Sequence, residues 1–77
     1  MNKQRRKQID KILARLQDCI VELEQIRDDE QEAFDNLPEG LQYSERGEMM
    51  EEYISDIDDV LSNLEDCTSN LDDIVNR

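Results

Sequence analysis

The stretch 36–40, Asn-Leu-Pro-Glu-Gly, contains the only proline and one of the two glycines in this 77-residue chain. Pro38 disfavours helical geometry at the residue before it, and Gly40 tolerates positive φ angles, so a helix is expected to end here. Ser44 then offers a side-chain oxygen that can cap a second helix. The stretch therefore predicts two helical halves joined by a short loop.

Apolar residues recur with helical spacing on both sides of this loop. In the first half, one row at alternating three- and four-residue steps, broken only by Glu30, consists of Ile9, Ile12, Leu16, Cys19, Leu23, Ile26, Ala33 and Leu37. A second row beside it consists of Leu13, Ile20 and Phe34. The second half repeats the design with Met50, Ile54, Ile57, Leu61, Leu64, Leu71 and Val75, flanked by Tyr53, Val60, Cys67 and Ile74. No segment alternates with period two, so no strand is predicted.

These observations predict an all-α fold, one domain over 1–77, with helix 4–36, loop 37–43 and helix 44–76. A connection this short makes the helices antiparallel neighbours in a coiled-coil-like hairpin. The residues expected to form its core or an oligomer contact are Ile9, Ile12, Leu16, Ile20, Leu23, Phe34, Ile54, Ile57, Leu61, Leu64 and Leu71. Two helices cannot bury both wide stripes, which favours a homodimer built as a four-helix bundle; a partner protein covering the exposed flank is the alternative.

Charge is the second strong signal, because 21 acids against nine bases give a formal net charge of −12. A body this acidic is repelled by nucleic acid and by anionic membranes, so we expect no direct binding to either and attraction to a basic protein surface. Residues 1–15 are the exception, with six bases and one acid. In a hairpin they either neutralise acids near the C-terminus (Glu65, Asp66, Asp72 and Asp73), form a free arm for an acidic partner, or fray.

Catalytic signals are weak, since the chain lacks His, Cys-x-x-Cys and any glycine-rich phosphate loop. We therefore expect no enzyme and no cofactor. One alternative is a Mg²⁺-dependent nucleotide pyrophosphohydrolase-like bundle, because carboxylates suit Mg²⁺ and occur here at i, i+3 spacing. The relevant pairs are Glu48 with Glu51 and Asp56 with Asp59, opposite Asp28, Asp29 and Glu32, but no group of bases accompanies them to hold phosphates.

The acids as a surface form the leading functional hypothesis. Carboxylate rows on a rigid helix can imitate the phosphates of a nucleic acid and occupy a basic channel; the alternative is that they serve solubility alone. The loop residues either contact the partner too, or Leu37, Leu41 and Tyr43 plug the end of the bundle. The candidate partner-binding residues are Asp28, Asp29, Glu32, Asp35, Leu41, Tyr43, Arg46, Gly47, Glu48, Glu51, Glu52, Asp56 and Asp59.

Cys19 and Cys67 fall on the apolar stripes and are expected to be small buried side chains. Residue 19 should face roughly residue 62 across the hairpin, which places the two cysteines too far apart for a disulfide. Two cysteines, no secretory signal and no membrane-spanning run predict a cytoplasmic protein with reduced thiols.

Residues 36–51, Asn-Leu-Pro-Glu-Gly-Leu-Gln-Tyr-Ser-Glu-Arg-Gly-Glu-Met-Met-Glu, and the acidic heptads that follow to Asp73 resemble a known element. They are similar to a loop-plus-helix unit in small acidic proteins encoded by phages and prophages of Gram-positive bacteria. The resemblance covers roughly half of the chain and implies a site of action in the bacterial host cytoplasm.

Small acidic phage proteins often disable host machinery, including CRISPR nucleases, which is an analogy at the level of class. We therefore expect a non-enzymatic, phage-derived inhibitor that occupies a basic site on a host protein. The alternative is a structural or oligomerisation module that acts through its apolar helix stripe.

Overall fold

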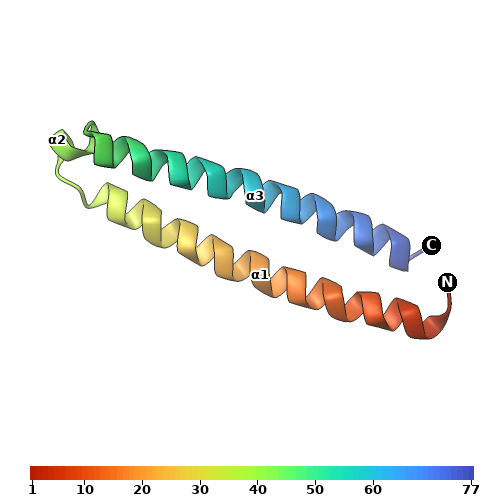
Figure 1. Cartoon of the computed structure of the whole chain (residues 1–77). Helices are drawn as coiled ribbons and strands as arrows, with labels where there is room; N and C mark the ends of the chain where they lie inside the picture. The colour runs from red at the N-terminus through yellow and green to blue at the C-terminus, as the bar shows by residue number, and fades with distance from the viewer.

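The computed structural model describes all 77 residues and contains three helices, α1 (Lys3–Asp35), α2 (Glu39–Gln42) and α3 (Glu45–Val75). The two long helices α1 and α3 run antiparallel side by side, with both chain termini at one end and α2 at the other (Figure 1). The predicted all-α hairpin is confirmed, and both long helices end within one residue of their predicted bounds. The predicted loop 37–43 was incomplete, because it contains α2.

Each long helix begins with a side-chain cap. The Asn2 side-chain oxygen accepts a hydrogen bond of 2.8 Å from the Arg5 backbone N–H, and the Ser44 hydroxyl accepts one of 3.4 Å from Gly47. These bonds satisfy backbone donors that have no partner within the helix. The predicted Ser44 cap is confirmed, and Glu45 and Glu48 follow it at the positive end of the helix dipole.

The connection between α1 and α3 is a short structured turn. α1 ends at Asp35, with Asn36 as its C-cap. Pro38, with φ −54° and ψ 143°, precedes α2, and its carbonyl accepts the bonds from Leu41 and Gln42 that form α2. The Gln42 amide then donates to the Phe34 and Leu37 carbonyls at 3.3 and 3.4 Å, at the end of α1. Positive φ at Gly40 was a wrong expectation, because Gly40 lies inside this right-handed turn of helix.

Gly47 is buried where the first turn of α3 packs on the main chain of α2. A Cβ atom added at Gly47 would lie 2.7 Å from the Leu41 carbonyl oxygen and 2.6 Å from the Gln42 carbonyl carbon. The sequence left open whether this glycine permits a close backbone approach, and the structure shows that it does. Gly47 was therefore wrongly proposed as a partner contact, since it has no free surface to offer.

The contact between α1 and α3 is a single seam that repeats every seven residues, as in an antiparallel coiled coil. On α1 it contains Arg6, Ile9, Leu13, Leu16, Ile20, Leu23, Arg27, Glu30 and Phe34, and Leu37 continues it just after the helix. On α3 it contains Gly47, Met50, Ile54, Ile57, Leu61, Leu64, Thr68, Leu71 and Val75. Leu13, Met50 and Leu61 are its only buried apolar side chains, and each keeps a few per cent of its surface exposed.

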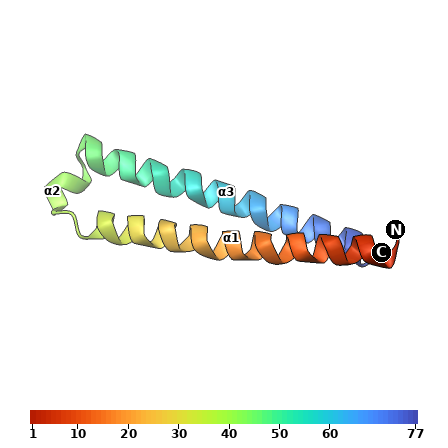
Figure 2. The same cartoon turned by 60° about the horizontal axis from the view of Figure 1, so that its bottom comes forward.

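Ten of the eleven predicted core residues lie in this seam, and Ile12 is the exception, with 46% of its surface exposed. The seam of α1 passes through the row of Leu13, Ile20 and Phe34, so Ile12 falls outside it. One facing helix covers only a narrow stripe, and the apolar stripe of α1 is wider than that. A view turned by 60° shows the pair with no further element over its outer faces (Figure 2).

Candidate interaction surfaces

One side of the hairpin carries an uncovered apolar surface, here termed the apolar face. On α1 it consists of residues at steps of seven, namely Ile12, Cys19, Ile26 and Ala33, all exposed. On α3 it consists of a second such row with Met49 beside it, namely Met49, Tyr53, Val60, Cys67 and Ile74. The seam and both of these rows repeat every seven residues. Each row therefore keeps a constant distance in sequence from the seam and stays on the same side of the hairpin along its length.

Two grooves show that both rows share this side. One groove of about 320 Å³ is lined by Ile26 of α1 together with Tyr53 and Val60 of α3. A second of about 510 Å³ is lined by Ala33 with Met49 and Tyr53. Four of the large side chains that line them, Ile26, Met49, Tyr53 and Val60, are about half exposed, from 46% for Met49 to 56% for Ile26. The sequence identified the α3 row as a flank, but Met49, outside the heptad row, was missed.

The opposite side of the seam is polar. Its groove, of about 360 Å³, is lined chiefly by Gln17 on α1 and by Glu65, Ser69 and Asp72 on α3. The two sides of the hairpin therefore differ, because the large exposed apolar side chains gather chiefly on the apolar face; Val21 of α1, which is 65% exposed, lies outside it.

The predicted acidic contact residues are all exposed, and the fold brings them into one half of the molecule. They occupy the last turns of α1 and the first half of α3, so at 1.5 Å rise per residue they lie within about 25 Å of the turn. Residues 22–59, here termed the loop half, contain fifteen carboxylates and two guanidinium groups, a formal charge of −13. The remaining residues, the open half, contain six carboxylates and seven bases, a formal charge of +1.

Arg27 makes the only two ion pairs in the structure. Its guanidinium donates to the Asp28 carboxylate at 2.9 Å and to Asp58 of α3 at 3.1 Å. The hydrogen bond to Asp28, followed by that to Asp58, raises the pKa of Arg27 above its ordinary value. The other carboxylates of the loop half, including eight of the nine acidic contact candidates, stand without an ion-pair partner.

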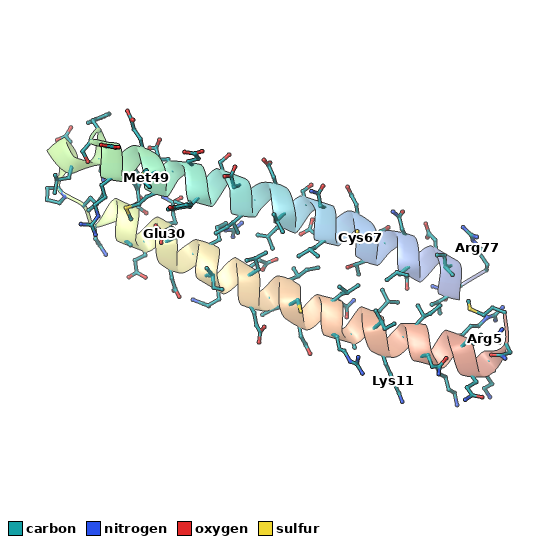
Figure 3. The ribbon with its side chains drawn as sticks, in the orientation of Figure 1. Arg5, Lys11, Glu30, Met49, Cys67 and Arg77 are labelled. Carbon is teal, nitrogen blue, oxygen red and sulfur yellow. The ribbon has the colours of Figure 1, made fainter.

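The sequence left open whether the basic N-terminal segment neutralises acids near the C-terminus. The fold brings both into the open half, whose formal charge is +1, but it forms no direct ion pairs between them. No basic side chain of 1–15 forms an ion pair, and Lys11 points away from α3 into solvent (Figure 3). Arg6 alone turns into the seam, where it donates to the Arg77 carbonyl at 3.2 Å. Of the acids near the C-terminus, Glu65 and Asp72 line the polar groove between the helices, whereas Asp66 and Asp73 do not.

The turn presents two exposed side chains rather than a plug. Tyr43 is 79% exposed and Leu41 is 47% exposed, whereas Leu37 is half-buried. The predicted plug is therefore wrong for Tyr43 and Leu41, and both stay available as contacts. Arg46 is also exposed and lines a groove with Glu30 and Glu45.

Both cysteines are free and exposed, which corrects the expectation that they are buried. The register also differs from the prediction. Because Arg27 faces Asp58 and Arg6 faces Arg77, Cys19 lies about level with Glu65, only two residues from Cys67.

No three carboxylate or thiol groups lie close enough together to hold a metal ion, so the carboxylates required by the hydrolase alternative are not gathered. No helix is long and apolar enough to cross a membrane. Comparison with protein-family models, curated proteins and solved structures finds no match to this chain.

Proposed function

We propose that this chain is a non-enzymatic, phage-derived binding protein that places its acidic loop half in a basic site on a host protein. This basic site on the host protein is one that normally binds nucleic acid, as in a CRISPR nuclease, and the binding takes place in the bacterial cytoplasm. The observation that carries the proposal is the formal charge of −13 over residues 22–59, nearly all of it on exposed carboxylates without ion-pair partners.

The helices space these carboxylates regularly. Asp28, Glu32 and Asp35 follow one another at steps of four and three residues, which sets neighbouring side chains about 5–6 Å apart on one surface of α1. Glu48, Glu52 and Asp59 continue such a row on α3. Rows of fixed negative charge on a rigid pair of helices match what a phosphate-binding channel is built to receive, and they speed encounter with it.

The turn adds a contact of a different kind. Tyr43 projects at the tip with 79% of its surface exposed, and Leu41 lies two residues before it. Exposed tyrosines supply large contact area at low entropic cost when they enter a pocket on a partner. The loop half, with Tyr43 at its tip, can therefore bind a basic cleft through both charge attraction and burial of apolar surface.

A displacement assay tests this proposal. A Cas9–guide RNA complex is bound to a fluorescently labelled DNA duplex, and the purified protein is titrated in while anisotropy is followed. The protein should release the duplex, and its apparent affinity should fall by roughly tenfold or more between about 50 and 200 mM NaCl. The same titration on a panel of basic bacterial DNA-binding proteins tests whether the target belongs to another class.

Two charge-reversal variants on α3 provide a matched comparison. The first combines Glu51→Lys, Glu52→Lys and Asp59→Lys in the loop half, and the second combines Glu65→Lys, Asp66→Lys and Asp73→Lys in the open half. Each changes the net charge by the same amount on the same helix. The first variant should lose roughly tenfold or more in affinity and the second much less. Equal losses, or no displacement from any basic protein by the unaltered chain, would contradict the proposal.

The second candidate function is a structural module that acts through the apolar face. The observation in its favour is that five large side chains of that face are about half exposed, namely Ile12, Ile26, Met49, Tyr53 and Val60. Association through apolar surface depends little on ionic strength, so binding that persists unchanged at 0.5 M NaCl would favour this alternative over the acidic inhibitor.

A further inference from the structure

The hairpin by itself buries little of its apolar surface. Only four of its 77 residues are buried, although 36% of its residues are hydrophobic. A chain of this length ordinarily needs a metal, a disulfide or an oligomer contact to supplement a core so small. The two cysteines are free and no metal-binding group is present, which leaves association as the available source.

We infer that the apolar face is covered by a second copy of this chain, with the turns of the two copies at opposite ends of a four-helix bundle. The inference is independent of the acidic-inhibitor function. It specifies the surface and orientation of self-association, whereas the sequence indicated only that a dimer is favoured.

The size of the face suits a stable dimer. The Cα atoms of the hairpin extend 59 Å along its axis and 15 Å across, so one whole side of the hairpin, with the apolar face along most of its length, measures about 900 Å². Stable protein–protein interfaces bury about 800 Å² on each partner. The repeat of seven residues on both helices also matches the hairpin's own seam, so the same packing geometry can continue into a second layer.

The charge distribution selects the orientation. A two-fold dimer with both turns at the same end would set one loop half, at −13, against another at −13. With the turns at opposite ends, each loop half instead lies against an open half at +1. Like charges that face each other across an interface repel and weaken binding. The arrangement with the turns at opposite ends avoids this repulsion and is therefore favoured.

One pair of residues on α1 supports this orientation locally. Arg15 lies one turn from both Ile12 and Cys19, and Asp29 lies one turn from both Ile26 and Ala33, so both border the apolar face. Each is seven residues from Glu22, which marks the middle of the face. When α1 runs antiparallel over α1 of the second copy, Arg15 of each chain lies opposite Asp29 of the other. The dimer gains two such pairs.

Solution mass gives the first test. Light scattering over roughly 1–200 µM should show twice the 9.1 kDa of the monomer. The double variant Ile26→Glu with Val60→Glu places two charges in the proposed contact and should weaken dimerisation by a factor of roughly 100 or more. Its control, Gln17→Glu with Ser69→Glu, adds the same charge on the polar side and should stay dimeric. A monomeric unaltered chain, or equal masses for the two variants, would overturn the inference.

Cross-linking tests the surface and the orientation without disturbing the core. Asn63 lies one turn from Val60 and Cys67, at the middle of the α3 part of the face. Asn63→Cys, in a chain with Cys19→Ser and Cys67→Ser, should form an interchain disulfide under mild copper–phenanthroline oxidation, because the two-fold axis brings residue 63 of both copies together. The unaltered chain should form no interchain disulfide.

With the turns at the same end, the result would be reversed. There α1 would lie over α3 of the second copy and bring Cys19 near its Cys67, so the unaltered chain would cross-link and the Asn63→Cys chain would not. That result would overturn the orientation. A dimer in which neither chain cross-links would place the contact on another surface and overturn the inference entirely. Displacement of DNA is a separate readout, so either failure leaves the acidic-inhibitor proposal standing.

Discussion

Gly47→Ala is the change that most directly tests how the turn and α3 fit together. In an exposed helix alanine is more favourable than glycine by about 1 kcal/mol, so helix propensity alone predicts a more stable protein. The structure predicts the opposite. The added Cβ would lie 2.7 Å from the Leu41 carbonyl oxygen and 2.6 Å from the Gln42 carbonyl carbon, both well inside van der Waals contact.

The magnitude follows from what must move. The atoms in the way belong to the backbone of α2, so relief requires α2 to shift rather than a side chain to rotate. Overpacking of this kind costs about 1–3 kcal/mol. A shift of α2 also weakens the Gln42 amide bonds to the Phe34 and Leu37 carbonyls, worth about 1 kcal/mol each. After the gain in propensity is subtracted, we expect a net loss of about 2 kcal/mol, or a fall in Tm of about 8–16 °C.

Thermal unfolding followed by circular dichroism at 222 nm measures this loss, with protein concentration held constant because dimerisation shifts Tm. Gly40→Ala is the matched control, since nothing lies within 4 Å of the Cβ that it would add. That variant lies in α2, lacks positive φ and should gain about 0.5–1 kcal/mol. A Gly47→Ala protein as stable as the unaltered chain would refute the close packing of α3 on α2.

Two further predictions concern exposed or partly exposed side chains. Tyr43→Ala should leave Tm unchanged within about 2 °C, because Tyr43 is 79% exposed, while weakening target binding in the DNA-displacement assay; a large fall in Tm would show that the ring packs on the hairpin instead. Arg27→Leu should raise Tm by a few degrees, because it extends the apolar seam and a partly exposed ion pair contributes little. The pKa of Arg27 is raised in the folded state, so its ion pairs contribute throughout pH 6 to 9, far below the range where the unfolded guanidinium titrates, and the difference in Tm should stay constant across that interval. A lower Tm for Arg27→Leu, or a difference that changes across that range, would contradict this account.

Much of this fold is predictable from the sequence because its elements depend on neighbours in the chain. Helical spacing of apolar residues, the proline at 38 and the Ser44 cap are local signals, and they place both helix ends within one residue. The short connection then permits only antiparallel neighbours. Net charge is likewise a property of composition, so the acidic character of the candidate surface needs no structure.

Other features depend on contacts between distant residues, and only the tertiary structure decided them. The apolar stripe of α1 is wider than one helix can cover, and the choice of Leu13 over Ile12 for the seam depends on the angle at which α3 approaches. That choice leaves the apolar face open. The requirement for glycine at position 47 could not be predicted from the sequence either. It arises because the α2 backbone packs against Gly47 and leaves no room for a Cβ atom. The hairpin also gathers two acidic segments into one half with a charge of −13, since charges far apart in sequence become neighbours only when the chain turns back on itself.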